Sequence, residues 1–222
     1  MKRINFLLFA TAILSFTFLT AASPTKSKSK SSQPTITLAN STYIVDLKSS
    51  KITWNIKTSR GANSGDLKIK DGQISEDKNR VKQATINMDM TAIIIRSIPP
   101  GIVNMKAVTI LNTESFFDVA RYPTSLLEIT KTIQKSDDTF EAIGFLTIKA
   151  KRQPIRFTMT GSFNYGHFEG TAKNIAVNRR LYDIRYTSGG DLDEKDLEGK
   201  IENAIDDSFT IDVFIVADKA SN

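Results

Sequence analysis

The chain changes its pattern at Glu114-Ser115-Phe116-Phe117-Asp118-Val119-Ala120-Arg121-Tyr122-Pro123. On both sides of this stretch, apolar residues alternate with polar ones, which is typical of half-buried β-strands. Two adjacent phenylalanines and a proline interrupt the alternation here. If the stretch is extended, successive side chains point to opposite sides. One of Phe116 and Phe117 would then face the interior, and the other would anchor a neighbouring helix from outside.

A short helix is predicted over residues 102–111, directly before this stretch. Pro99-Pro100-Gly101 precedes the helix, and these residues fit neither a helix interior nor a central strand. Residues 114–123 are therefore predicted to join the helix to a second block of strands, with Tyr122-Pro123 beginning the next extended segment.

The alternation predicts strands on both sides of this junction. Ser49-Ser50 indicates a bend, Gly61 to Gly65 a loop, and Asp71-Gly72 a two-residue hairpin turn. An acidic stretch over residues 191–203 favours a helix. The predicted strands lie within residues 43–47, 52–56, 67–74, 84–90, 127–133, 140–149, 155–163, 167–177, 182–187 and 209–217.

These elements predict an all-β fold with one or two short helices. There are about eight strand positions with short turns and no alternation of strand and helix, which favours a closed antiparallel β-barrel or a sandwich. Closure into a barrel leaves no unpaired strand edge. A barrel of about eight strands has room inside for side chains or for one small ligand.

The N-terminus has the pattern of a secretory signal. Lys2 and Arg3 form a positive region, residues 6–19 are largely apolar, and Thr20-Ala21-Ala22 offers small residues for cleavage. We predict a signal peptide over residues 1–22, a flexible Lys- and Ser-rich linker over 23–40 and a β-barrel domain over 41–222. The predicted location is the periplasm or the exterior of the cell. An uncleaved membrane anchor is the alternative.

The positive charge of the chain is concentrated at this N-terminus. The net charge is +6, but the first 40 residues hold five Lys or Arg and no acid, so the other 25 basic residues nearly balance 24 acidic ones. A basic nucleic-acid-binding face is therefore not expected. Lys26, Lys28 and Lys30 suit a transient contact with anionic lipid headgroups. The oligomeric state is not indicated.

Motifs for catalysis and metal binding are missing. The chain has no cysteine and a single histidine, His167, so it lacks a Cys-His pair and the usual ligands of a zinc site. It has no Gly-x-Ser-x-Gly turn and no phosphate-binding glycine loop. The acidic residues from Asp191 to Glu198 do not fit a calcium loop, because Asp196 stands where the turn glycine is needed. No catalytic residue, metal or cofactor is predicted, and the protein is expected not to be an enzyme.

Large apolar side chains on the predicted inner faces offer a different function. An isoprene unit has five carbons, so its burial is worth roughly 4 kcal/mol before ordering costs, at ~0.8 kcal/mol per methylene. Burial of a few such units would give micromolar or tighter binding. The residues predicted to line a ligand cavity are Trp54, Ile56, Ile86, Met88, Met90, Phe116, Phe117, Phe157, Met159, Phe163, Phe209, Ile211 and Val213.

Several motifs occur in a recognisable order: residues 114–123, then Gly144-Phe145-Leu146-Thr147-Ile148-Lys149, then Gln153-Pro154-Ile155-Arg156-Phe157. Asn178-Arg179 with Tyr182 and Ile184, and residues 205–209, follow. As a set they resemble the YceI-like polyisoprenoid-binding family over residues 43–217. The resemblance implies a lipocalin-like barrel, an exported protein, and a long isoprenoid or similar lipid in the lumen.

The chain departs from the family pattern at two positions. Ile110-Leu111-Asn112 stands where the family usually has a helix ending in His-Leu, and Ala150 stands where it usually has glycine. Both differences concern loop geometry rather than the barrel.

Three functional hypotheses follow. The leading one is a non-enzymatic exported carrier that holds an isoprenoid lipid, with a quinone as a related ligand. The second is an enzyme that acts on a lipid or quinone, for which Asp118, Tyr122, His167, Arg179 and Tyr182 are the available polar residues. The third is an exported structural or partner-binding domain whose lumen is filled by side chains.

Overall fold

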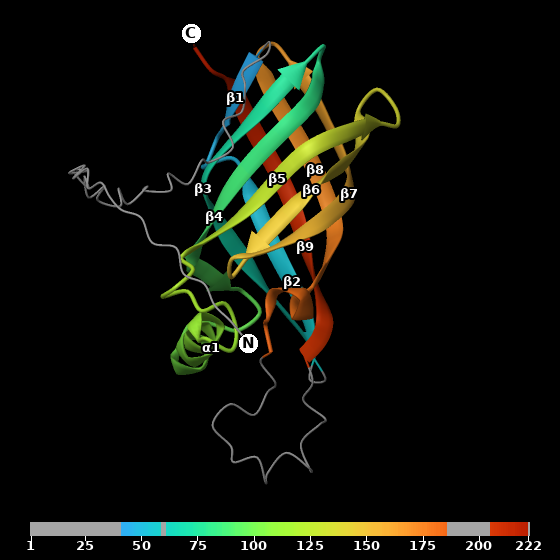
Figure 1. The fold of residues 1–222 in the computed structure, drawn as a ribbon. Coiled ribbons are helices and arrows are strands. Elements are labelled where there is room, and N and C mark those ends of the chain that lie inside the picture. The colour runs from blue at the N-terminus through green and yellow to red at the C-terminus, as the bar shows by residue number, and fades with distance from the viewer. Residues whose placement is uncertain (1–40, 59–60, 186–204, 222) are drawn as a thin grey trace, which may run out of the picture. The chain divides into compact units, whose positions relative to one another are not determined.

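The computed structural model describes residues 41–58, 61–185 and 205–221. They form one antiparallel sheet that closes on itself, with a helix at one end of the barrel (Figure 1). Within the described ranges, no helix is long and apolar enough to cross a bilayer. The elements are β1 Ser41–Val45, β2 Lys51–Thr58, β3 Gly61–Asp77, β4 Arg80–Ile95, α1 Ile102–Asn112, β5 Thr124–Gln134, β6 Thr139–Ile148, β7 Lys151–Asn164, β8 His167–Asn178, the 3-10 helix η1 Arg179–Tyr182, and β9 Ile205–Lys219.

The sheet follows the order β3-β2-β9-β8-β7-β6-β5-β4, and the pairing of β4 with β3 closes it. β1 and β2 both pair with β3 and β9, so they occupy successive parts of one strand position. The Asp46 carboxylate accepts hydrogen bonds from the N–H groups of Lys48 and Ser49 between them. The predicted closed barrel of eight strand positions is therefore confirmed, and the predicted bend at Ser49-Ser50 lies within this interruption.

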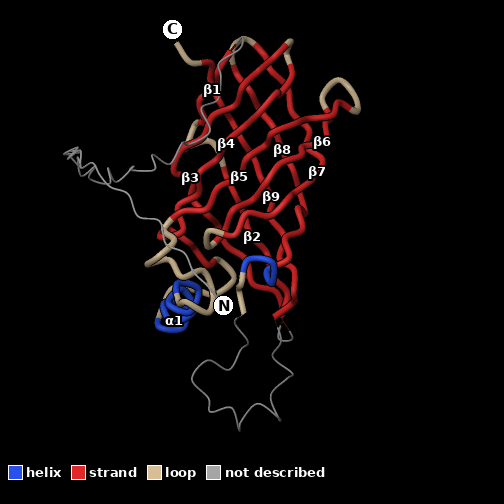
Figure 2. Tube along the Cα trace, in the orientation of Figure 1, coloured by secondary structure: helices blue, strands red, loops and turns tan. Residues whose placement is uncertain are grey.

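Period-two alternation explains why the barrel has an apolar interior. Ala84, Ile86, Met88 and Met90 on β4 are 8%, 5%, 3% and 3% exposed, whereas the residues between them are more accessible. β9 repeats the pattern, with every second residue from Phe209 to Ala217 buried and Phe214 exposed on the outer face. Since successive side chains of a strand point to opposite faces, each strand places one apolar row inside. Figure 2 shows that strands form the whole wall of the barrel.

Tight hairpins connect several of the strands. Lys78-Asn79, Lys149-Ala150 and Tyr165-Gly166 each have two consecutive residues with positive φ. This is the geometry of a type I′ turn, whose twist matches that of the flanking strands. The turn predicted at Asp71-Gly72 is wrong, because both residues lie inside β3 at a bulge and the chain reverses at Lys78-Asn79 instead.

Two further predictions differ from the structure, and three concern residues outside the described ranges. Residues 61–65 are the first part of β3 rather than a loop, because they pair with β2 and β4. Over residues 182–185 the predicted strand is wrong, since η1 ends there in a turn at Asp183. The helix predicted over 191–203 lies outside the described residues, as do the signal peptide and linker.

The predicted short helix is present as α1. Gly101 precedes it with a φ of 148°, and the Asn104 side chain donates hydrogen bonds to the carbonyls of Ile95 and Ile98. These bonds fix the start of α1 against the end of β4. The helix buries no residue completely, so it covers one end of the barrel rather than filling it.

Candidate ligand-binding cavity

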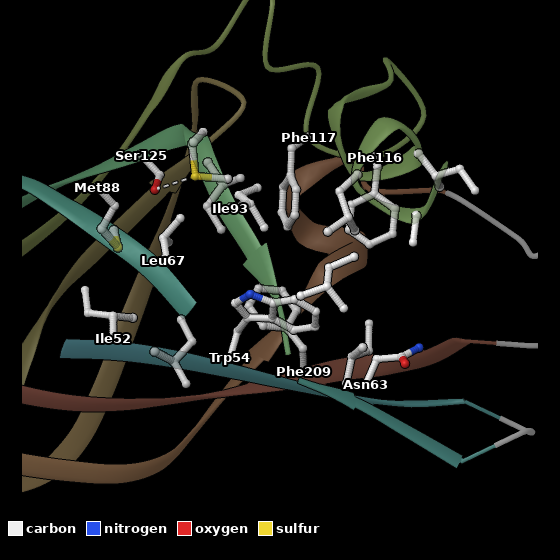
Figure 3. Close-up of a pocket in the computed structure, with 18 of the residues that line it drawn as sticks. Ile52, Trp54, Asn63, Leu67, Met88, Ile93, Phe116, Phe117, Ser125 and Phe209 are labelled. Carbon is white, nitrogen blue, oxygen red and sulfur yellow. Dashed lines mark hydrogen bonds between the residues drawn. The ribbon is translucent and has the colours of Figure 1, made fainter. Parts of the chain in front are cut away.

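A cavity of about 350 Å³ lies at the end of the barrel that α1 covers. Pockets for small ligands span roughly 300–1,000 Å³, so this one is large enough for a ligand. Its wall comes from the barrel strands, α1 and the loop after the helix (Figure 3). The lining residues are Ile52, Trp54, Ile56, Thr58, Asn63, Leu67, Met88, Met90, Ile93, Ile95, Ile98, Ala107, Ile110, Leu111, Phe116, Phe117, Ser125, Leu146, Ile148, Phe209 and Ile211.

Eight of the thirteen residues predicted from the sequence border this cavity: Trp54, Ile56, Met88, Met90, Phe116, Phe117, Phe209 and Ile211. Four of them come from β2 and β9, which pair directly through Trp54 with Ile211 and Ile56 with Phe209. The other four come from β4 and from the loop before β5. Sequence positions more than 150 residues apart thus form one apolar wall.

The other five predicted residues do not line the cavity: Ile86, Phe157, Met159, Phe163 and Val213. They belong to the core or pack against it. Phe163, for example, has its ring centroid 4.7 Å from those of both Tyr43 and Phe168. Alternation identifies inward-facing residues but not how far along the lumen they lie. These side chains fill the barrel away from α1.

The loop after α1 is not extended, and this changes the prediction for its two phenylalanines. The N–H of Phe117 donates to the carbonyl of Leu111, and that of Asp118 donates to Thr113 at 2.7 Å. The chain therefore folds back on the end of the helix. Phe116 and Phe117 both line the cavity and pack edge to face, with centroids 4.7 Å apart. The prediction that one of them points outward is wrong.

Trp54 lies along the wall opposite this loop, and Figure 3 shows Phe117 directed from the loop toward it. Gly65 is the partner of Trp54 on β3. A Cβ atom at Gly65 would lie 2.7 Å from Cζ2 of the indole and would collide with the carbonyl oxygen of Ile94. Glycine is needed there because the indole and β4 both approach the backbone closely.

Sequence reasoning missed the lining residues at the end of β4 and on α1. Ala107, Ile110 and Leu111 have the i, i+3, i+4 spacing of one helix face, which is the signal that could have identified them. By contrast, Ile93, Ile95 and Ile98 lie in a stretch where the strand alternation ends. They carry no local pattern that separates them from other core residues.

Few polar groups border the cavity. The Ser125 hydroxyl is buried and donates to the Met90 sulfur at 3.1 Å, which is a weak acceptor. Asn63 accepts a hydrogen bond from Ser97. The indole Nε1 of Trp54 is buried without a hydrogen-bond partner within the described part of the chain. The cavity therefore suits a ligand that is held mainly through apolar contacts.

The polar residues proposed for a lipid- or quinone-modifying enzyme lie elsewhere. His167 is exposed at the β7–β8 turn and pairs with Asp218. Asp118 pairs with Arg121 at 3.1 Å in the loop, and Tyr182 is a core residue whose burial raises its pKa to about 12. None of the five candidates is among the residues of the described chain that line the cavity. In the same ranges, no group of acidic or histidine side chains could hold a metal ion.

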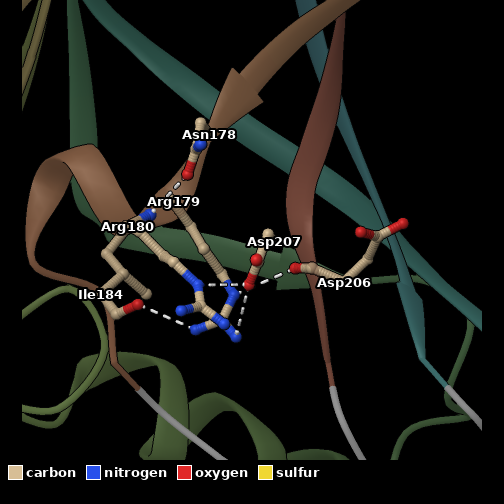
Figure 4. Close-up of polar contacts among 6 residues, drawn as sticks. All are labelled: Asn178, Arg179, Arg180, Ile184, Asp206 and Asp207. Atoms are coloured by element: carbon tan, nitrogen blue, oxygen red, sulfur yellow. Dashed lines mark hydrogen bonds and ion pairs between the residues drawn. The ribbon is translucent and has the colours of Figure 1, made fainter.

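Arg179 instead fastens the beginning of β9 to the segment after η1 (Figure 4). Its Nη1 donates to the Ile184 carbonyl at 2.8 Å, and its Nε donates to the Asp206 carbonyl at 3.0 Å. Burial lowers the pKa of the Arg179 guanidinium, while nearby Asp207 opposes this shift. Arg180 also pairs with Asp207, at 2.6 Å. These contacts give the Asn178-Arg179 and 205–209 motifs a structural role.

Comparison with known families agrees with this architecture. The model of the YceI-like domain matches residues 43–217. The chain belongs to the YceI-like family. The matched residues span the barrel from β1 to β9. The YceI-like motif at residues 114–123 forms the loop beside the cavity, and the motif at residues 144–149 forms the second half of β6 and the first residue of the β6–β7 turn. Comparison with the curated proteins finds no match.

Solved structures share this YceI-like fold. Burkholderia cenocepacia BcnA is 18% identical with a TM-score of 0.60, and the match covers 78% of this chain and 98% of BcnA. A polyisoprenoid-binding domain from Saccharophagus degradans, implicated in plant cell wall breakdown, is 11% identical with a TM-score of 0.60, covering 82% and 100% of the two chains. At these identities the likeness concerns the fold.

Proposed function

We propose that this protein is a non-enzymatic, exported carrier that holds an isoprenoid or similar long-chain lipid in its barrel. The observation that carries the proposal is the apolar cavity of about 350 Å³ beneath α1. A domain with a purely structural role would gain stability by filling this volume, because each empty part of a core forfeits packing contacts.

The chemistry of the lining residues supports a flexible hydrocarbon ligand. Met88 and Met90 contribute side chains that adapt to irregular apolar shapes, and Trp54, Phe116, Phe117 and Phe209 add broad apolar surfaces. A branched isoprenoid chain matches such a wall better than a charged metabolite. The relative from Saccharophagus degradans described as a polyisoprenoid-binding domain adds support at the level of the family.

Membrane contact and export complete the proposal. On the outer side of α1, Ile102, Val103 and Met105 are 72%, 67% and 70% exposed, next to Lys106. Such apolar side chains beside a cation suit a transient contact with the headgroup region of a bilayer, where a carrier collects or delivers lipid. The signal-like residues 1–22 and the basic linker over 23–40 support an exported protein that works near a membrane surface.

The direct test is the lipid content of the protein purified without detergent from its native host. Solvent extraction and mass spectrometry should recover one class of isoprenoid lipid in near-stoichiometric amount. Repeated recovery of a lipid-free protein that also fails to bind added isoprenols would disprove the carrier proposal.

A titration provides the second readout. Trp54 is the only tryptophan of the chain and borders the cavity, so its fluorescence reports on occupancy. Farnesol and geranylgeraniol should change the emission saturably, whereas linear alcohols of similar polarity but shorter chain should bind more weakly. Turnover of any added lipid or quinone would instead favour the enzymatic alternative.

A further inference from the structure

Lys149 makes a contact that the proposed carrier function does not by itself explain. It lies in the tight turn between β6 and β7 and is 9% exposed. Its ammonium group donates hydrogen bonds to the backbone carbonyls of Glu114, at 2.7 Å, and Asp183, at 2.9 Å. Hydrogen bonds from a charged donor are stronger than those between neutral groups.

These two carbonyls belong to segments far apart in the sequence. Glu114 begins the loop that carries Phe116 and Phe117, and Asp183 follows η1. The N–H of Arg185 donates to the carbonyl of Ser115 at 3.0 Å, so the same two segments are also joined directly. One ammonium group thus connects the β6–β7 turn, the segment after η1 and the loop at the covered end of the cavity.

Several other polar contacts of this loop stay within the lobe that the loop forms with α1. The N–H groups of Phe116, Phe117 and Asp118 bond to carbonyls of residues 111–113, which are part of the same lobe of α1 and loop. Arg121 pairs with Glu114 and Asp118, again within this lobe. These contacts shape the loop internally, whereas the bonds from Lys149 and Arg185 attach its first residues to the β6–β7 turn and the segment after η1. Asn104 attaches the start of α1 to β4, and the Met90 N–H donates to the Pro123 carbonyl at the far end of the loop.

We propose that Lys149 is a positioning residue for ligand retention: it holds the loop with Phe116 and Phe117 against the barrel and so controls how readily the cavity opens. This rests on the proposed carrier function for its role in binding. The attachment itself is a property of the empty protein and can be measured without a ligand.

The test compares Lys149→Met with Lys151→Met in the full-length mature chain. Methionine keeps the unbranched side chain and so suits the positive φ of 50° at Lys149, but it cannot donate to the two carbonyls. Lys151, at the start of β7, is exposed and provides the matched loss of one charge. Lys149→Arg restores a charged donor and should recover part of the wild-type behaviour.

Three quantities are measured below the onset of unfolding of each variant. In Lys149→Met, farnesol should dissociate about tenfold faster, with a smaller change in the association rate. In the ligand-free protein, acrylamide should quench Trp54 more strongly, and the amides of Phe116, Phe117 and Asp118 should exchange hydrogen faster. Lys151→Met should match the wild type in all three.

The proposal would be overturned if Lys149→Met is less stable but matches Lys151→Met in farnesol dissociation rate, acrylamide quenching of Trp54 and amide hydrogen exchange. Lys149 would then have only a structural role. If the wild type binds no isoprenol, the carrier proposal fails, while the quenching and exchange measurements still decide whether Lys149 holds the loop. If Lys149→Met does not fold, Lys149→Gln, which retains an uncharged donor, is measured in the same way and must show the same direction of change.

Discussion

Replacement of Ala107 by phenylalanine should block the cavity without damaging the barrel. Ala107 lies on the face of α1 that lines the cavity, together with Ile110 and Leu111. A phenyl ring at this position would project into space that a ligand needs. It would also bury apolar surface that now borders an empty volume, so the substitution adds contacts rather than removing them.

The expected loss of affinity can be worked out from the atoms displaced. The ring takes the place of about six ligand atoms, and drug-sized ligands gain about 0.3 kcal/mol per atom. The binding free energy should therefore weaken by about 2 kcal/mol, or roughly 30-fold in Kd. Phenylalanine is a weaker helix former than alanine by about 0.5 kcal/mol, which the added apolar contacts should offset.

The assay is a titration with geranylgeraniol, read by Trp54 fluorescence, beside a thermal melt. Val103→Phe is the matched control, because Val103 is 67% exposed on the outer side of the same helix. It should bind like the wild type. An unchanged Kd in Ala107→Phe, with the melting temperature preserved, would refute the assignment of this cavity as the ligand site. An equal loss of affinity in Val103→Phe would show that the helix, not the cavity, is responsible.

Three further predictions concern the cavity loop, a turn and the core. Phe116→Ala and Phe117→Ala should each weaken isoprenol binding by about tenfold or more, since both rings border the cavity. Phe116 is only 6% exposed, so Phe116→Ala should also lower the free energy of unfolding by roughly 3 kcal/mol, which is more than Phe117→Ala should. Titrations and urea denaturation check this, and loss of binding in only one variant would contradict it. Ala150→Gly should raise stability by about 1 kcal/mol, or roughly 2–4 °C in Tm, because Ala150 has a φ of 57° that glycine adopts without strain; an unchanged melting temperature would count against strain at this turn. Burial raises the pKa of Tyr182 from 10.0 to about 12, so the unfolded chain releases this proton at a lower pH than the folded chain does. The free energy of unfolding should therefore fall as pH rises from 10 to 12. Urea denaturation should show a shallower fall in Tyr182→Phe, and an identical pH profile would argue against the shift.

The barrel could be predicted from the sequence because its strands have one buried face. Residues such as Ala84, Ile86 and Met88 alternate with polar residues, and this alternation shows which face of the strand is buried. Each strand of the barrel also forms its backbone hydrogen bonds in the same way, with a neighbour on either side. The short helix could also be predicted, since Pro99-Pro100-Gly101 marks the end of β4. These signals are local, so they can be interpreted from the sequence without knowledge of the tertiary structure.

The turn at Asp71-Gly72 was predicted wrongly because the glycine is required by a contact with a strand that is distant in the sequence. Asp71-Gly72 resembles a hairpin turn, but a Cβ at Gly72 would lie 2.8 Å from the Val45 side chain on β1. The glycine is there to let another strand approach. Lys78-Asn79 forms the real turn with positive φ at both residues, although neither is glycine. Composition alone does not distinguish these two uses of the backbone.

The candidate site was only partly predictable for a related reason. Alternation places Met88 and Phe163 equally on the inner surface, yet one lines the cavity and the other belongs to an aromatic cluster at the opposite end. One of the two loop phenylalanines was expected to face outward, because the sequence does not reveal that the chain folds back on α1. The position of a residue along the lumen depends on strand register, which is set by the whole sheet.

The cluster of Tyr43, Phe163 and Phe168 fills the end of the barrel opposite α1. Phe168 is 1% exposed and the other two rings are 5% and 6% exposed, so that end is sealed by packed side chains. The lumen is therefore a blind pocket and not a tunnel. In the proposed carrier, a lipid tail that enters beneath α1 would leave by the same end, so the donor and the acceptor of the lipid would meet the protein there in turn.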